Sequence, residues 1–466
     1  MEGLTTVVLA AGEGTRLRPL TTHRPKPMLP GATTPILEHV FDQLIEAGVG
    51  EITVVVGYGR NRVQSHFGSR FRDVPVRYVV QDRQLGTGHA LAQAESAVDG
   101  PCLVVYGDQI VDHRIIADVL AAHEADAGDG GNDTVATLGV LERENVSDYG
   151  GVILANERGG SAAADGGGSS AMDESESPVA DSTESRAAGR TIDRQVRCVE
   201  EIVERPGDDR YYHLNAGVYV LEPAAFAAVR TIEPRAGERS LIDGLVAMLD
   251  DGADVRGVVS SGLWVDATYP WDLLYLAGAL FDAGVVEGSG VGDRNGDVDE
   301  SSLDDAAGKV DGTDDARTGA ATSGIHETAV LREPVAIAPD CAVGPGAVVG
   351  PYTALGANVT VESNAVIERS VIDRDCRIGA NATVTDAVTG VGVVIGAGST
   401  IPGGPGDVRV GDRIHPNEDL GALLADRVTD GGGVTYAPGA VVGAGATIAP
   451  GSTVEGTIDD ETEVRS

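Results

Sequence analysis

The sequence predicts an α/β domain with a mostly parallel sheet, followed by a separate parallel β-helix. Between residues 1 and 284, apolar strand segments alternate with amphipathic helix patterns, which is typical of a doubly wound α/β fold. From residue 325 onward, aliphatic residues recur every six positions, which is typical of a β-helix built from hexapeptide repeats. The length of 466 residues accommodates both units.

The strands and helices of the first domain follow one another in a regular order. An apolar strand over residues 4–10 precedes an amphipathic helix over 36–45, which Gly48 closes. A second helix is expected over residues 89–97. Because ligands of such sheets bind beyond the carboxyl ends of the strands, the turn after residue 10 is a candidate binding site. The remaining expected strands span residues 51–57, 76–81, 102–107 and 134–141.

Two segments interrupt this order because they lack apolar periodicity and are rich in Gly, Ser, Ala and acidic residues. We expect residues 157–190 to form a disordered surface insertion. Residues 285–324 have the same composition and are expected to form an acidic, Gly-rich linker. The predicted domains therefore span residues 1–284 and 325–458.

The six-residue period of the second domain is carried by single aliphatic residues. One such residue in each repeat points into the core of the prism, and Gly or Pro forms the turns, as at 344–346. Residues 402–433 break the period, so we expect a loop or an insertion there. The aliphatic series comprises Ile337, Val343, Val349, Leu355, Val361 and Ile367, and it resumes at Val442, Ile448 and Val454.

The composition is strongly acidic, with 72 Asp and Glu against 34 Lys and Arg and a formal net charge of −38. This balance resembles that of haloarchaeal proteins, in which salt screens the repulsion between acidic side chains. An acidic surface that binds a partner is the alternative interpretation. Binding of nucleic acid is disfavoured, because no basic patch exists outside one short segment near the N-terminus.

The four cysteines, at positions 102, 198, 341 and 376, lie far apart and form no C-x-x-C pair. Neither a zinc site nor a disulfide framework is therefore indicated. No basic leader precedes an apolar segment at the N-terminus, and no apolar run reaches the roughly 18 residues of a membrane span. We expect a cytoplasmic protein without membrane contact.

Residues 9–30 read LAAGEGTRLRPLTTHRPKPMLP and contain a phosphate-binding pattern. The apolar strand leads into the turn 12–16, where glycine lets the backbone approach a phosphate and turn N–H groups can point at it. Lys26 is one of only two lysines in the chain, the other being Lys309. Since arginine carries nearly all the other positive charges, a lysine in this segment indicates a need for a compact ammonium that contacts a phosphate. The basic residues of the segment are Arg16, Arg18, Arg24 and Lys26.

This string resembles the signature of the sugar-1-phosphate nucleotidyltransferases, L-A-A-G-x-G-T-R-L-x-P-L-T followed by P-K-P. The resemblance implies that the loop wraps a nucleoside triphosphate, and that Arg16 and Lys26 are catalytic residues that contact its phosphates. It also implies that the nucleotide is bound by Leu9, Ala10, Ala11, Gly12, Gly14 and Thr15.

Residues 81–90, QDRQLGTGHA, resemble the family segment that reads a pyrimidine base, in its uridyltransferase version. The resemblance adds Gln81, Gly86 and Thr87 to the nucleotide-binding residues. Residues 104–108, VVYGD, place an aspartate at the end of a buried strand, where it is suited to hold Mg²⁺. Asp108 matches the metal aspartate of the family, and Asp266 in WVDATYPWD matches the second metal ligand.

Three further segments resemble the sugar-binding motifs of the family. Tyr149-Gly150 resembles a Y-G segment, and residues 202–206, IVERP, resemble V-E-K-P with Arg205 where lysine is usual. Residues 214–217, LNAG, resemble N-x-G. The sugar-binding residues that the resemblance implies are Gly150, Glu204 and Asn215.

The resemblance as a whole implies Mg²⁺-dependent transfer of a nucleotidyl group from UTP or dTTP to a hexose-1-phosphate, glucose-1-phosphate or N-acetylglucosamine-1-phosphate, with release of pyrophosphate. The attacking sugar phosphate is already ionised, so catalysis requires positioning and charge neutralisation rather than a protein nucleophile.

The arrangement of the two domains also resembles the bifunctional uridyltransferase/acetyltransferases, whose left-handed β-helix acetylates glucosamine-1-phosphate with acetyl-CoA. Here residues 368–383 contain no histidine, and Pro402-Gly403 stand where A-N is expected. The histidines of this domain, His326 and His415, are expected to lie outside the regular coils. We therefore expect the β-helix to serve as a scaffold that assembles a homotrimer. The alternatives are a working acetyltransferase or a non-catalytic regulatory paralogue.

Overall fold

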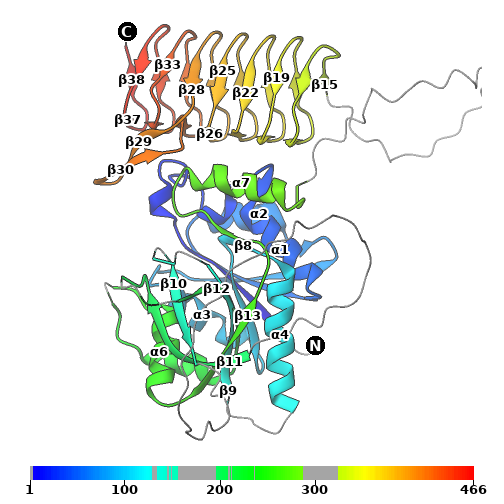
Figure 1. The fold of residues 1–466 in the computed structure, drawn as a ribbon, viewed down its shortest axis with the longest axis vertical. Helices are drawn as coiled ribbons and strands as arrows, with labels where there is room; N and C mark the ends of the chain where they lie inside the picture. The colour runs from blue at the N-terminus through cyan, green and yellow to red at the C-terminus, as the bar shows by residue number, and fades with distance from the viewer. Residues whose placement is uncertain are drawn as a thin grey trace, which may run out of the picture.

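The computed structural model describes residues 4–128, 134–143, 146–147, 149–155, 196–207, 210, 212–235, 237–286 and 324–465. The expected insertion at 157–190 lies outside the described residues, as does the expected linker apart from residues 285, 286 and 324. The described residues form an α/β domain with a β-helix lying against one end of it (Figure 1). No helix among them is both long and apolar enough to span a membrane.

The α/β domain is built on a ten-stranded sheet with the order β10-β11-β13-β9-β12-β7-β1-β4-β6-β5. At its centre β1 (Thr5–Ala10) lies between β4 (Ile52–Val56) and β7 (Cys102–Tyr106) and runs parallel to both. The strand β6 (Val74–Val80) continues the parallel set beside β4. The predicted parallel α/β arrangement is confirmed for these strands, whose carboxyl ends meet at one edge of the sheet.

The other half of the sheet is mixed, which the sequence patterns did not specify. Strand β12 (His213–Leu221) runs antiparallel to both β7 and β9 (Thr134–Leu141). Strand β13 (Asp254–Ser260) is parallel to β9 and antiparallel to β11 (Val196–Glu204). At the edge of this half, β10 (Gly150–Leu154) pairs antiparallel with β11 and also reaches β12. At the opposite edge of the sheet, β5 (Arg70–Phe71) pairs antiparallel with β6.

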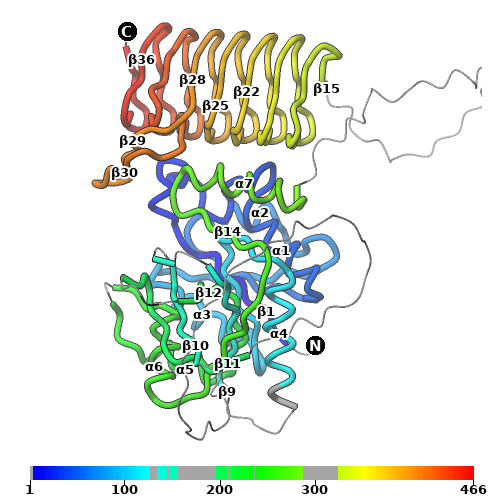
Figure 2. Tube along the Cα trace, viewed as in Figure 1, coloured from blue at the N-terminus to red at the C-terminus, as the bar shows by residue number. Residues whose placement is uncertain are grey.

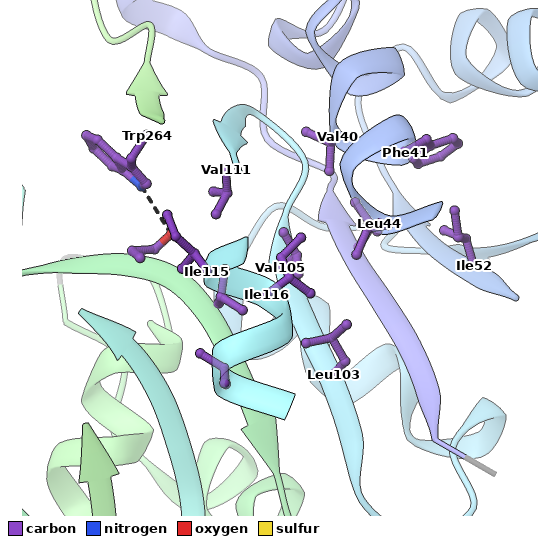
Figure 3. Packing of buried hydrophobic residues seen from close by; sticks show 14 of the residues in the cluster. Val40, Phe41, Leu44, Ile52, Leu103, Val105, Val111, Ile115, Ile116 and Trp264 are labelled. Atoms are coloured by element: carbon purple, nitrogen blue, oxygen red, sulfur yellow. Dashed lines mark hydrogen bonds between the residues drawn. The ribbon is translucent and has the colours of Figure 1, made fainter. Parts of the chain in front are cut away.

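Helices cover both faces of this sheet because each presents one apolar side to it. Leu44 of α1 and Ile115 and Ile116 of α4 gather around Leu103 and Val105 of β7, as Figure 3 shows. Residues of α3, α5 and α6 form the core on the opposite face. The helices span Ile36–Glu46 (α1), Arg60–Phe67 (α2), Thr87–Ala94 (α3), His113–Gly128 (α4), Ala224–Thr231 (α5) and Leu241–Asp250 (α6).

The described residues from 324 onward wind into a β-helix with three parallel sheets (Figure 2). Each coil contributes one strand to each sheet, as in the pairing of Ala342 with Thr360 and of Thr360 with Arg377. The predicted aliphatic series points inward and forms one continuous core, which confirms the β-helix. The three sheets are β15-β18-β21-β24-β27-β32-β35-β38, β16-β19-β22-β25-β28-β33-β36 and β17-β20-β23-β26-β31-β34-β37.

The expectation that residues 402–433 lie outside the coils is wrong for the second half of that segment. Only a hairpin, β29 (Gly406–Val410) and β30 (Arg413–Glu418), leaves the prism. The coils resume at β31 (Ala422–Leu424), whose Ala422 pairs with Ala387. The period was hidden because two inward positions are polar: the hydroxyl of Tyr436 donates to Oδ2 of Asp430 at 3.0 Å, and both are buried.

The expectation for His326 is also wrong, because this residue lies inside the first coil. It directly follows β15 (Gly324–Ile325), and its backbone N–H donates to the carbonyl of Val343 at 2.8 Å. His415 does lie outside the coils, on β30 of the hairpin.

One sheet of the β-helix packs directly against the α/β domain. Helix α7 (Asp272–Asp282) lies on the sheet β17–β37, between the two parts in Figures 1 and 2. Leu273, Leu276 and Leu280 of α7 are fully buried in a cluster that both parts share. The side of the sheet that faces α7 carries small or aliphatic residues, which lets the helix approach closely. These residues are Ala336, Ala354, Val371, Val388, Leu423 and Val441.

Candidate active site

The predicted phosphate loop begins where β1 ends. Leu9, Ala10 and Ala11 are buried in the sheet, whereas Gly12 faces open space and a side chain there would meet no protein atom within 4 Å. Gly14 has φ +71°, and a Cβ built on it would lie 2.7 Å from Cβ of Lys26. The absence of a side chain at this position therefore lets the loop lie directly on Lys26.

Two more residues of this loop reach the surface in the short 3₁₀ turn Thr15–Leu17. The side chains of Thr15 and Arg16 are exposed, and Arg16 makes no ion pair with a carboxylate of the described residues. An exposed guanidinium beside an open glycine turn leaves room for an anion at this position.

Lys26 bridges the two aspartates that were predicted to hold a metal. Its Nζ lies 2.6 Å from Oδ1 of Asp266 and 3.1 Å from Oδ2 of Asp108. Burial lowers the pKa of Lys26, but these carboxylates more than offset that effect, so its pKa is raised and the ammonium stays charged.

A short antiparallel ribbon brings the two aspartates together. Strand β8 (Gln109–Val111) pairs with β14 (Trp264–Asp266) so that Gln109 lies opposite Asp266, which places Asp108 beside Asp266. Thr268 Oγ1 donates to Oδ2 of Asp266 at 2.7 Å and orients that carboxylate.

The donor set fits a magnesium ion. Two carboxylates lie within reach of one cation, and the described residues contain no cluster of three or more His, Cys, Asp or Glu side chains that could enclose a metal. Mg²⁺ is commonly held by one or two carboxylates together with water and substrate phosphates, rather than by an all-protein cage. Asp108 and Asp266 meet that description.

The residues predicted to read the base lie together at the start of α3. Gln81 is buried, and its Nε2 donates to the carbonyl of Gly86 at 3.1 Å and lies 2.9 Å from Nδ1 of His89. Thr87 Oγ1 accepts from the N–H of Leu241 at 2.9 Å. The amide nitrogen of Gln81 is thus used to hold the turn, and its contact with a base stays a prediction.

The three predicted sugar-binding residues also lie together. Gly150 of β10 is paired in register with Glu204 of β11. A Cβ on Gly150 would lie 3.3 Å from Cβ of Asn215, so Asn215 is the direct neighbour of this glycine. Nδ2 of Asn215 is buried without a hydrogen-bond partner in the described part of the chain, which leaves a donor available to a ligand.

Gln109 supports the site but has no signal in the sequence motifs. Its Nε2 donates to the carbonyl of Ala216, and Trp264 Nε1 donates to the same oxygen at 3.1 Å, the bond drawn in Figure 3. A Cβ on Gly217, which has φ +70°, would lie 2.1 Å from Nε2 of Gln109. The glycine of the LNAG segment is therefore needed for Gln109 to join the β8–β14 ribbon to β12.

Arg24 does not belong with the phosphate-facing basic residues. Its side chain is buried at the boundary with the β-helix, where Nη1 donates to Oδ2 of Asp373 and Nη2 lies 3.6 Å from Oδ1 of Asp426. Arg18 pairs with Glu13 at the surface. Of the four basic residues in the segment, Lys26 and Arg16 remain as candidates for phosphate contacts.

These features define an α/β domain in which a lysine lies between two aspartates at the carboxyl edge of the sheet. Residues 5–164 match the family described as Nucleotidyl transferase, and residues 331–458 match the GMPPB C-terminal domain. The chain therefore carries a nucleotidyl transferase domain followed by a GMPPB C-terminal domain. The resemblance to the nucleotidyltransferases that was drawn from the motifs is confirmed by these matches.

Several proteins of known name are similar to this chain over part of its length. The bifunctional protein GlmU of Methanococcus maripaludis is 29% identical over 272 residues, which cover 58% of this chain and 52% of that protein. The UTP–glucose-1-phosphate uridylyltransferase AglF of Haloferax volcanii is 28% identical over 267 residues, covering 57% of this chain and 92% of AglF. A solved UDP-glucose pyrophosphorylase from Acinetobacter baumannii aligns at 19% identity with a TM-score of 0.46, covering 60% of this chain and 94% of that one. The chain thus spans about half the length of the Methanococcus relative.

Proposed function

We propose that this protein transfers a nucleotidyl group from UTP or dTTP to a hexose-1-phosphate and releases pyrophosphate. The observation that carries the proposal is the convergence of Lys26, Asp108 and Asp266 beneath the Gly14 turn, at the carboxyl ends of β1 and β7. The relatives support the same class of substrates, since AglF is named for UTP and glucose-1-phosphate.

In this proposal the residues of the chain bind and orient two substrates, the nucleoside triphosphate and the sugar phosphate. The open turn at Gly12 accepts the triphosphate, and Arg16 and Lys26 neutralise charge on its phosphates. Gly150, Glu204 and Asn215 hold the sugar hydroxyls and fix the attacking phosphate in line with the α-phosphorus. Asp108 and Asp266 would hold Mg²⁺, which supplies further charge neutralisation at the phosphates when bound.

The test is pyrophosphate release by the full-length protein in molar KCl with Mg²⁺, using each combination of UTP or dTTP with glucose-1-phosphate or N-acetylglucosamine-1-phosphate. We expect turnover with at least one pair and its loss in Asp108→Asn. The matched control is Asp73→Asn, an exposed aspartate after β5, which should retain the rate of the parent protein. No pyrophosphate with any pair, from a folded protein, would contradict the proposal.

We further propose that the β-helix assembles three copies of the chain rather than acetylating a sugar. The first outward position of each strand in the sheet β16–β36 carries Val or Thr, in a protein with a net charge of −38. Glu368 at the end of β22 is also outward, and it pairs with Arg332 at 3.0 Å. This row of uncharged positions suits burial against another copy. His415 is buried against Tyr269 and Trp271, with ring centroids 4.6 and 5.2 Å away, so its ring is enclosed at the boundary between the two domains. The residues at this first outward position are Val330, Val348, Val366, Thr383, Thr400, Thr435 and Thr453.

Light scattering tests the assembly. The parent protein should show three subunits, and Val348→Glu on the sheet β16–β36 should reduce that number. Ala342→Glu, an exposed position on the sheet β15–β38, is the matched control and should leave the assembly unchanged. A monomeric parent protein would contradict the proposal, and acetyl-CoA consumption with glucosamine-1-phosphate would contradict the scaffold role.

A further inference from the structure

The β-helix contacts the active-site loop through a buried charge cluster. This cluster consists of Arg24, Asp373 and Asp426, with side chains that are 5%, 12% and 7% exposed. Arg24 comes from the nucleotidyl transferase domain, whereas both carboxylates come from coils of the β-helix. Backbone N–H groups of the β-helix hold the two aspartates in place. Asp373 Oδ1 accepts from the N–H of Arg374 at 2.7 Å, and Asp426 Oδ1 accepts from the N–H of Val391 at 3.0 Å.

A buried ion pair is a poor device for holding two domains together. Removing charges from water costs free energy that their attraction seldom exceeds, and aliphatic contacts of similar volume hold equally well. The packing of the β-helix against the buried side of α7 is aliphatic, through Val371, Val388 and Leu423. Nε of Arg24 is buried and has no hydrogen-bond partner among the described residues, so one buried donor of the cluster is left unsatisfied. The presence of this charge cluster therefore indicates a role other than holding the two domains together.

The backbone between Arg24 and Lys26 is stiff enough to transmit position. Pro25 lies between the two residues and fixes its own φ, and Pro27 follows Lys26. Gly59 has φ +62°, and a Cβ on it would lie 2.6 Å from Cδ of Pro25, so this proline is packed against the turn after β4. A displacement of Arg24 must therefore move Lys26, whose ammonium has to meet two carboxylates at once.

The β-helix touches the other side of the metal pair as well. His415 of the hairpin stands against the stacked rings of Tyr269 and Trp271, whose centroids are 4.8 Å apart with an interplanar angle of 8°. Tyr269 directly follows Thr268, the residue that orients Asp266. Two separate contacts from the β-helix thus reach the two chain segments that form the Lys26–Asp266 ion pair.

We infer that Arg24 is a positioning residue for Lys26, and that the β-helix completes the catalytic site of the nucleotidyl transferase domain by holding Arg24 between Asp373 and Asp426. The inference rests on the proposed function for its kinetic consequence only. The contacts described above are sufficient support for its geometric part, in which the β-helix carboxylates fix the position of Lys26.

The chain offers a direct readout of that geometry because it has only two lysines. The full-length protein is treated with a small acylating reagent, and the rate of modification at Lys26 is followed by mass spectrometry relative to Lys309. Two variants are compared with the parent protein: Asp373→Asn/Asp426→Asn, and the same pair with Arg24→Met, which removes all three buried charges and limits the loss of stability. Val388→Ala, which shortens an aliphatic side chain of the same boundary and removes no charge, is the matched control.

We expect Lys26 to be modified about tenfold faster in both charge variants and at the parent rate in Val388→Ala, with all proteins folded by circular dichroism. In the pyrophosphate assay, kcat should fall by about ten- to a hundredfold in the charge variants, the cost of a displacement of order 1 Å. Arg24→Met added to Lys26→Arg should cause no further loss, since one residue acts through the other.

Unchanged modification of Lys26 in both charge variants would overturn the inference, whether or not the protein is active. Additive losses from Arg24→Met and Lys26→Arg would also overturn it, because they would show that the two residues act independently. If the parent protein releases no pyrophosphate with any substrate pair, the proposed function fails, while the modification rates still decide where Lys26 is held.

Discussion

Replacing Lys26 by arginine tests whether the site needs a point charge or only a positive charge. The Lys26 side chain is 11% exposed, and its Nζ meets Asp266 at 2.6 Å and Asp108 at 3.1 Å. Its stem lies directly under Gly14, since a Cβ on Gly14 would come within 2.7 Å of the Lys26 Cβ. A planar guanidinium is longer and wider than an ammonium and has no room to settle between the carboxylates.

The size of the effect follows from this enclosure. Forcing extra atoms into a packed site costs about 1–3 kcal/mol, and moving a catalytic group by about 1 Å reduces the rate by roughly a hundredfold. A hundredfold loss in kcat/KM corresponds to about 2.7 kcal/mol of lost transition-state stabilisation. We therefore expect Lys26→Arg to retain its fold and lose about two orders of magnitude in kcat/KM.

The assay is pyrophosphate release at saturating Mg²⁺ in molar KCl, with circular dichroism to confirm folding. Lys309→Arg is the matched control, because it makes the same chemical change at the only other lysine of the chain. If Lys26→Arg turned over within twofold of the parent protein, the need for a compact ammonium at this position would be refuted.

Three further predictions concern the metal, pH and salt. Asp108→Asn should remove most of the activity, by several kcal/mol of transition-state stabilisation, and full activity of the folded variant at ordinary Mg²⁺ would disprove the metal assignment. Burial lowers the pKa of His39 from its usual 6.5, and its Nε2 lies 2.7 Å from the carbonyl of Gly31. The unfolded chain then binds a proton that the folded chain does not, so the free energy of unfolding should fall as the pH drops below about 6.5. His39→Gln should reduce the change of the free energy of unfolding with pH, as measured by denaturant titrations at several pH values. An unchanged pH dependence would count against this role of His39. Because the net charge is −38, dilution from molar to millimolar KCl should unfold the protein, as followed by circular dichroism, whereas a cooperative fold at low salt would argue against adaptation to high salt.

The local parts of the fold and the site were predictable because their signals lie in contiguous residues. The helix α1 follows the apolar spacing after Pro35, and the strands of the parallel core are short aliphatic runs. The residues of the phosphate turn, Asp108 and Asp266 stand in strings whose order along the chain is itself informative. The inward aliphatics of the β-helix follow from a simple period.

The long-range pairs were not predictable, since no local pattern encodes them. Arg24 and Asp373 lie 349 residues apart, so the sequence placed Arg24 with its neighbours in the basic segment. The polar pair Asp430 and Tyr436 occupies two inward positions of the β-helix, and a search for aliphatic residues therefore lost the period there. Gln109 holds the β8–β14 ribbon through the carbonyl of Ala216, a residue on a different strand, and no motif marks it.

The most direct test of the account is to follow the products themselves by ³¹P NMR. Full-length protein, Mg²⁺ and molar KCl are mixed with UTP or dTTP and glucose-1-phosphate or N-acetylglucosamine-1-phosphate. We expect the signals of a nucleotide sugar and of pyrophosphate to grow together in equal amounts for at least one pair of substrates. With Asp108→Asn neither signal should grow. Folded protein that leaves every pair unchanged, or that releases pyrophosphate or phosphate without forming a nucleotide sugar, would contradict the account.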